Sequence, residues 1–424
     1  MSLVTRARDA VAARIALALV ITLPAVVLRL AGVHPPPVPS MIVFGAGVLG
    51  AAVLLLWASE TARLDLSGAL ALALLALIAV LPEYAVDLYY AYAAGSRPEY
   101  AAYAAANMTG ANRLLVGVGW TLVALVFALA VRRRREAGRH RRIGVIQPPS
   151  PRRDVRLGGH HRIELGFLAV AAVLAFIPAL TGEIGWYVSV LLIVVFVAYM
   201  ARIGRSGADD VENLVGVPAR LAELPRLRRR QVTWLGFALG ALAVFCSAEP
   251  FAESLVDAGT VLGVDRFLLV QWLAPLTSEA PELIVACVFA WRLRDGDAIG
   301  VLLSSKVNQW TLLIGSLPLA YRAGGGAWSL PLDARQIEEV LLTAAQTVLG
   351  LAMLVGLYFR RAEAALLFVL FAVQFVFPGT QIRLVLSGVY LAIGFSLLIA
   401  RNRDLGQCLR AAVPSLDRPR SPVR

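Results

Sequence analysis

Long apolar segments recur along this chain and restrict it to one class of fold. Of the 424 residues, 59% are hydrophobic and 16% are charged. Many apolar runs reach about 20 residues, the length that a helix needs to cross the hydrocarbon core of a bilayer. A backbone in lipid must satisfy its own hydrogen bonds, which favours helices. The sequence therefore predicts an all-α polytopic membrane protein.

About twelve transmembrane helices follow from these apolar runs. They cover residues 11–33, 39–60, 66–94, 98–131, 162–181, 184–203, 231–257, 264–292, 297–321, 334–358, 362–378 and 381–401.

The net charge of +12 resides mainly in arginine clusters between these segments. With the N-terminus inside, twelve crossings place the clusters at 132–161, 204–230, 292–294, 360–361 and the C-terminal tail on one side. Cytoplasmic loops carry such an excess of Lys and Arg, so we expect an integral protein of the plasma (inner) membrane with both termini cytoplasmic. Anionic lipid is then an expected partner of these loops, and nucleic acid is excluded as one. The three dispersed cysteines form neither a disulfide framework nor a metal motif.

Two Pro-Glu pairs, Pro82-Glu83 and Pro281-Glu282, lie within apolar segments in opposite halves of the chain. A carboxylate at membrane depth is costly and indicates a functional site, and proline opens the helix beside it. On the twelve-helix map the two segments run in opposite directions, which indicates inverted repeats, an arrangement typical of transporters. We therefore expect five parts along the chain. The first half has an extra transmembrane helix at 1–38 and a first five-helix repeat at 39–203, which contains the basic cytoplasmic loop 132–161. A cytoplasmic linker at 204–230 leads to a second repeat at 231–380 and to an extra helix with a basic cytoplasmic tail at 381–424.

Polar residues follow each Pro-Glu pair in the next apolar segment. The first patch spans 107–112 and the second 304–311. Ser304 and Asn308 lie four residues apart on one helical face, as do Ser278 and Glu282. Carboxylate, amide and hydroxyl oxygens are the ligands that a hard cation prefers. The alternative is that the small polar residues only hold helices together.

These motifs resemble the two alpha repeats of the calcium/cation antiporter superfamily. The resemblance rests on Leu81-Pro82-Glu83 with Asn107-x-x-Gly110-x-Asn112, and on Thr277-Ser278-x-x-Pro281-Glu282 with Ser304-x-x-x-Asn308. It implies five plus five inverted helices, here with one more at each end. It also implies a cation-binding site, whose residues would be Glu83, Asn112, Ser278, Glu282, Ser304 and Asn308, to which Glu279 at a family serine position is added.

Departures from the family pattern bear on the transported ion. Ala79 and Val80 replace the Thr-Ser of the first repeat, and Lys306 stands at a glycine position. Fewer oxygens suit calcium poorly. Lys306 is expected to contact Glu279 or Glu282. Helix geometry places it off the face of Ser304 and Asn308, so the alternative is that it faces Asp87 or a neighbouring helix, and Arg113 raises the same question. Asp87, Lys306 and Arg113 are therefore predicted to be proton-coupling or charge-partner residues.

Glu249 and Glu253, one helical turn apart, suggest an acidic route along which cations approach the site. The alternative is that they belong to a polar helix end that faces its neighbours.

The sequence thus predicts a secondary-active antiporter that exchanges a cation (Na⁺ or Ca²⁺) for protons by alternating access at a midplane glutamate site. It would be no enzyme, because motifs such as His-Glu-x-x-His are missing from the sequence, and it would need no cofactor beyond its transported ions. Two alternatives remain open: a sodium/calcium exchanger, and a transport-silent sensor or scaffold in which Lys306 permanently neutralises the site.

Overall fold

The computed structural model describes residues 3–65, 80–139, 154–204, 214, 216–377 and 379–413. Parts of four expected features, at 66–79, 140–153, 205–213 and 414–424, lie outside the described residues. The helices of the first half are α1 (Leu3–Leu30), α2 (Pro37–Ala62), α4 (Leu81–Ala94), α5 (Tyr100–Leu114), α6 (Thr121–Arg139), α7 (Arg162–Leu174), α8 (Phe176–Thr181) and α9 (Trp186–Gly204). Those of the second half are α10 (Val217–Leu221), α11 (Arg226–Leu262), α12 (Arg266–Trp291), α13 (Asp295–Asn308), α14 (Ile314–Ala323), α15 (Ala334–Leu354), α16 (Arg361–Val376), α17 (Thr380–Ala400) and α18 (Asn402–Ala412).

Nine helices within the described ranges are long and apolar enough to cross a membrane. The expected spans at 66–94, 297–321 and 362–378 are not among them. Only α4 is described from the first of these spans, and the third, α16, has just 16 residues. The second corresponds to a continuous helix made of α13, a π-helical segment and α14. The all-helical membrane fold is confirmed, whereas the exact number of twelve spans is not.

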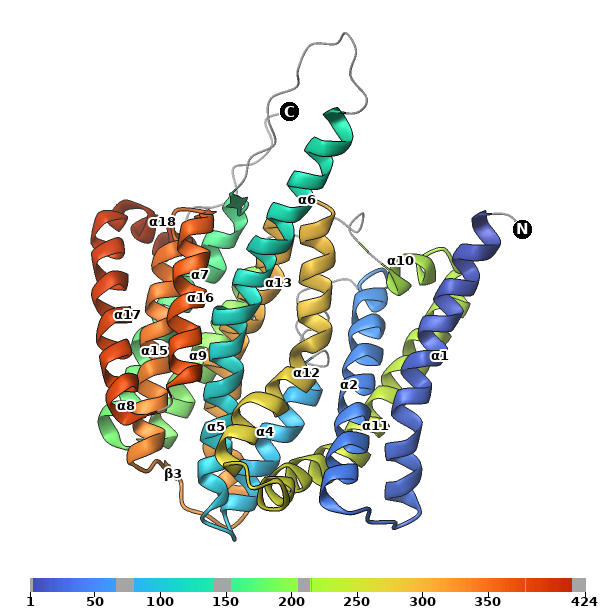
Figure 1. Ribbon diagram of the computed structural model, residues 1–424, viewed down its shortest axis with the longest axis horizontal. Coiled ribbons are helices and arrows are strands. Elements are labelled where there is room, and N and C mark those ends of the chain that lie inside the picture. Colours follow the sequence, from blue (N-terminus) through green and yellow to red (C-terminus); the bar gives the residue numbers. More distant parts are fainter. Residues whose placement is uncertain are drawn as a thin grey trace, which may run out of the picture.

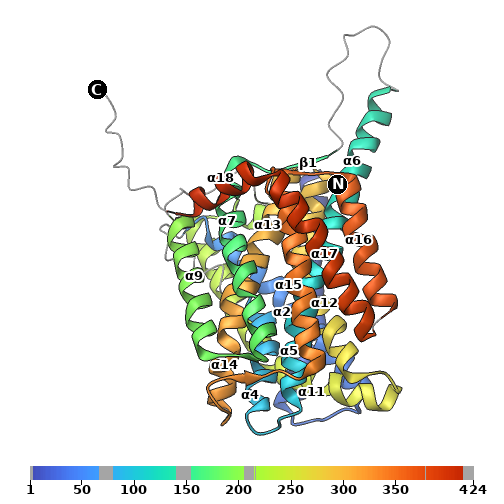
Figure 2. The same ribbon diagram turned by 90° about the vertical axis from the view of Figure 1, so that its left-hand side faces the viewer.

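Two short β-ribbons lie on two opposite faces of the bundle and show which loops share a face. Strand β1 (Val155–Arg156) pairs antiparallel with β4 (Tyr358–Phe359), and the backbone N–H of Arg156 donates to Asp295, 2.7 Å away. Strand β2 (Glu183–Ile184) pairs with β3 (Leu330–Pro331) on the opposite face. The N-terminus, the end of α6, α10 and α18 all lie on the face of the first ribbon (Figures 1 and 2). The described parts of the basic segments that the charge pattern grouped together therefore do share one face.

Both halves contain a π-helical segment just after a site asparagine. In the first half, residues Leu115–Trp120 follow α5 and its Asn112. In the second half, Gln309–Leu313 directly follow Asn308. Single-turn π-helical segments are rare in proteins, and those that occur often lie at functional sites. Their equivalent placement is a structural counterpart of the sequence repeat.

The two Pro-Glu pairs act differently on their helices. Pro82 lies in the first turn of α4, where a missing N–H costs nothing because that group has no intrahelical acceptor. Pro281 instead lies inside α12, which continues from Arg266 to Trp291. The expected opening of the helix thus occurs as a helix start in the first half only, while in the second half Pro281 removes a single hydrogen bond within a continuous helix.

The site helices lie in the middle of the molecule. Figure 1 shows α1, α2 and α11 grouped on the right-hand side and α15 to α17 on the left, with α4, α5 and α12 between them. Helices α5 and α12 come from different repeats and approach very closely at Gly110. A Cβ atom on Gly110 would lie 1.7 Å from the backbone oxygen of Gln271.

Replacing Gly110 with Ala should therefore destabilise the protein. We expect a loss of about 1–3 kcal/mol, the usual range for overpacking, seen as a lower melting temperature in detergent. Gly388→Ala in α17 is the matched control, because a Cβ there meets nothing within 4 Å and Ala is the better helix former. Equal stability of the two variants would contradict this account of the α5–α12 contact.

Candidate cation site

Residues from both repeats line one narrow pocket. Glu83 of α4 meets Ser278, Glu279 and Glu282 of α12 there, with the walls completed by Ala52, Leu56, Val80, Pro82 and Pro281. Its cavity volume of about 10 Å³ is the space that the centre of a single water molecule needs. The pocket can therefore hold one small particle, such as a dehydrated ion, against several carboxylates.

Carboxylate oxygens in and near this pocket have few protein donors. Glu83 and Asp87, four residues apart on α4, are almost fully buried, and Glu279 on α12 is too. Across the described part of the chain, no hydrogen-bond donor reaches Oε1 of Glu83, Oε2 of Glu279 or Glu282, or either oxygen of Asp87. A buried carboxylate without a partner is strongly unfavourable. Such oxygens call for a bound cation or a proton.

The two repeat asparagines already have donors within the protein. The Tyr84 hydroxyl donates to Asn308 Oδ1 at 2.9 Å. The Lys306 ammonium donates to both the backbone oxygen and Oδ1 of Asn112, each at 2.9 Å. The side-chain oxygens of Asn112 and Asn308 are therefore occupied in this conformation, unlike those of the carboxylates.

Lys306 contacts a neighbouring helix, α5, which was one of the two expectations, rather than Glu279 or Glu282. Its side chain is fully buried and lies 5.1 Å from the centre of the Trp310 ring. Within the described ranges its ammonium forms no ion pair with Glu279, Glu282 or Asp87, and its bonds go to Asn112. The reason is geometric: Lys306 points away from the face of Ser304 and Asn308 and reaches α5.

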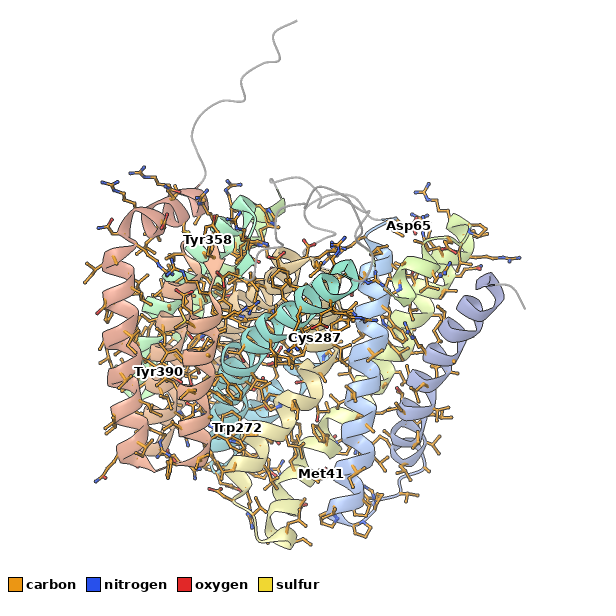
Figure 3. All side chains as sticks on the ribbon, turned by 45° about the horizontal axis from the view of Figure 1, so that its top comes forward. Met41, Asp65, Trp272, Cys287, Tyr358 and Tyr390 are labelled. Atoms are coloured by element: carbon orange, nitrogen blue, oxygen red, sulfur yellow. The ribbon has the colours of Figure 1, made fainter. Side chains whose placement is uncertain are left out.

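Arg113 also has a partner other than the predicted site. Its guanidinium pairs with Glu339 of α15 at 2.5 Å and lies 5.1 Å from the ring of Trp272, marked on α12 in Figure 3. Both charges are almost completely buried. Arg383 of α17 adds contacts to Glu338 at 2.7 Å and to Glu339 at 3.7 Å. Arg113 thus belongs to a buried ion-pair network between α5, α15 and α17, and not to the pocket.

Glu249 and Glu253 contact arginines near the end of α11. Glu249 pairs with Arg29. Glu253 pairs with Arg97 at 3.1 Å and accepts a hydrogen bond from Tyr89 at 2.6 Å. These contacts fit the second interpretation of the sequence, a polar helix end that faces its neighbours. A carboxylate with an arginine partner offers an approaching cation less than a free one does.

Two site features escaped the sequence analysis. Gln309 donates to Glu279 Oε1 at 2.7 Å, and Glu339 carries the partner charge of Arg113. Gln309 could have been found, because it directly follows the polar run that ends at Asn308. Ser304, by contrast, is only half-buried and does not line the pocket. Ser278 lines it, while its hydroxyl contacts the backbone oxygens of Ala274 and Pro275, each at 3.3 Å.

No group of three His, Cys, Asp or Glu side chains among the described residues is arranged to hold a metal ion. Carboxylates from two repeats that meet inside an all-helical bundle are a feature of membrane transporters, in which the ion is a passing substrate.

The family follows from comparison with known sequences. The model of the family described as "Sodium/calcium exchanger protein" matches residues 38–204 and 232–379, and these two stretches contain both Pro-Glu motifs. The chain belongs to this family. It is an integral membrane protein of inverted repeats in a family of transporters, as the resemblance implied.

Three relatives show how far the similarity extends. The crystal structure of an H⁺/Ca²⁺ exchanger, CAX, has a TM-score of 0.85 and 38% identity, covering 94% of this chain and 96% of that one. The Ca²⁺/H⁺ antiporter YfkE has a TM-score of 0.57, with 89% and 99% coverage; at 12% identity it supports the fold alone. "Putative antiporter CaxA" of Alkalimonas amylolytica is 27% identical over 144 residues, 33% of this chain and 43% of that relative.

Proposed function

We propose that this protein is a secondary-active cation antiporter that exchanges Na⁺ or Ca²⁺ for protons at the Glu83–Glu282 pocket. The observation that carries the proposal is the meeting of carboxylates from both repeats in one ion-sized pocket, with several oxygens lacking donors. Such oxygens are stable at membrane depth only when a cation or a proton neutralises them. Cation and proton then compete for the same groups.

Competition of this kind produces exchange. The pocket is too costly to carry through the bilayer when it is empty and charged, so the inverted repeats change faces with either a cation or protons bound. Glu83, Asp87, Glu279 and Glu282 are the proposed proton carriers, because they lie in or beside the pocket and none of its described lining residues is a histidine.

The similarity to an H⁺/Ca²⁺ exchanger along nearly the full chain favours protons over sodium as the coupling ion. Sodium/calcium exchange is the alternative. The transport-silent alternative required Lys306 to neutralise the site through a lasting salt bridge. Lys306 bonds Asn112 instead, which favours active transport over that alternative.

Proteoliposomes loaded with a pH-sensitive dye test the proposal. An imposed proton gradient at a clamped membrane potential, followed by external Na⁺, K⁺ or Ca²⁺, should give proton movement with one cation only. Proton movement with none of them would contradict proton coupling, and calcium-45 uptake with and without internal sodium would then test sodium/calcium exchange.

The face of the bundle that carries the β1–β4 ribbon is rich in arginine, and by the positive-inside rule it is the proposed cytoplasmic face in the plasma membrane. It would carry both termini, the loop at 132–161 and the linker at 204–230. The proposed domains have the limits predicted from the sequence: 1–38, 39–203, 204–230, 231–380 and 381–424. Labelling of single introduced cysteines from the outside of intact cells should spare this face and modify the face of the β2–β3 ribbon.

Anionic lipid should bind between the ends of α6 and α12. A cavity of about 380 Å³ there is lined by Ala130, Arg133, Arg134, Trp291, Arg292 and Leu293. Each arginine near an anionic surface contributes about 1 kcal/mol. Replacing the three arginines with Gln should therefore abolish most of the thermal stabilisation that phosphatidylglycerol nanodiscs give over phosphatidylcholine ones. The control carries the same charge change at the exposed residues Arg228, Arg230 and Arg403; an equal loss in both variants would contradict a specific lipid site.

A further inference from the structure

Lys306 places a basic group inside the protein, at a position lined by oxygen atoms and an aromatic ring. The side chain is fully buried. Two oxygens of Asn112 receive its ammonium at 2.9 Å, and the Trp310 ring faces it from 5.1 Å. Carbonyl oxygens together with an aromatic face are a typical binding site for a monovalent cation.

The repeat symmetry shows what is unusual about this position. Asn308 directly precedes the π-helical segment of its half, and Asn112 lies shortly before the π-helical segment of the other half. The oxygen of Asn308 receives a neutral donor, the Tyr84 hydroxyl, whereas the oxygens of Asn112 receive a charged one. The bond from Lys306 also joins α13 of the second repeat to α5 of the first. The donor to the asparagine oxygen is therefore a basic side chain for the asparagine of the first half and a neutral hydroxyl for that of the second.

We propose that the Lys306 ammonium is a covalently attached substitute for a second cation, so that only one free cation is bound and carried in each cycle. The inference rests on the proposed function. The pocket itself has room for one small particle, and the Asn112 position is filled permanently from within. Lys306 is thus a specificity-determining residue that sets the number of ions carried and the charge moved per cycle.

Shortening the side chain should open the position to an external cation. Lys306→Ala leaves the two Asn112 oxygens and the Trp310 face in place but removes the ammonium. We expect the purified, full-length variant to bind one more ²²Na⁺ per chain than the wild type in equilibrium dialysis. Ethylammonium, which can replace the lost end of the side chain, should compete for this added site and not for the first one.

A transport assay tests the same inference independently. In proteoliposomes at a clamped potential, Lys306→Ala should carry one more charge with the cation per cycle, and its cation dependence should become steeper. Lys306→Gln serves as the second variant, because its amide can still donate to Asn112 and fill the space; it should bind no additional cation. This variant also answers the objection that a shortened side chain merely unfolds the site.

The outcomes separate this inference from the proposed function. The same number of bound Na⁺ ions in wild type and a folded Lys306→Ala would overturn the inference, as would an additional ion that ethylammonium does not displace. If the wild type moves no cation in liposomes, the antiporter proposal fails, yet the binding comparison still decides whether Lys306 fills a cation position.

Discussion

Glu282→Gln is expected to abolish cation-dependent proton movement in proteoliposomes. The substitution keeps the shape of the side chain but removes the charge that a cation needs and the group that a proton occupies. Breaking a buried charge interaction typically costs about 3 kcal/mol or more, which corresponds to at least about a hundredfold loss. Glu83→Gln should have a similar effect, because Glu83 faces the same pocket from the other repeat.

Glu136→Gln is the matched control for these two variants. Glu136 is a glutamate of α6 whose side chain is 57% exposed and pairs with Arg132 along the same helix. Exposed pairs of this kind contribute little, so this variant should transport like the wild type. Transport by a well-folded Glu282→Gln at the wild-type rate would disprove the assignment of the pocket as the cation site.

The second large effect is expected from the Arg113–Glu339 pair. Removing one partner of a buried ion pair leaves an uncompensated charge and typically costs about 3–5 kcal/mol. Arg113→Met and Glu339→Met should therefore each lower the melting temperature strongly in detergent. The double variant Arg113→Met/Glu339→Met should recover much of the loss, because two apolar side chains leave no charge unpaired.

A double-mutant cycle decides whether the two residues act together. Additive losses would contradict the pair as the main contact of either residue. Arg113 adjoins Asn112, yet it does not line the pocket, so the folded fraction of Arg113→Met should keep its apparent cation affinity. A large change in that affinity would instead place Arg113 in the cation site.

Much of the fold and part of the site follow from sequence patterns. Apolar length predicts the membrane helices, and arginine placement predicts which loops share a face; the two β-ribbons agree with that grouping. The pocket was also foreseeable in part. Glu83 and Glu282 were singled out because a carboxylate in an apolar helix is costly, and Ser278 and Glu279 through the resemblance to the family motif; all four line one pocket.

The partners of the other charged residues could not be predicted in this way. Lys306 pairs with Asn112, Arg113 with Glu339 and Glu253 with Arg97, and in each case the two residues lie far apart in the chain. A charge at membrane depth shows that some partner must exist. It does not show which one, because the partner depends on which faces of distant helices meet.

The sequence by itself determined that this chain crosses a membrane, because desolvation acts on each segment separately. Its two Pro-Glu motifs also predicted a site to which both halves contribute. Only the tertiary structure decided which of the charged residues remain available to an ion. Packing of α5 against α12, α13 and α15 gives Lys306 and Arg113 partners of their own and leaves one oxygen each of Glu83, Glu279 and Glu282 without a donor. That distribution arises from side-chain geometry between helices, which no single segment encodes.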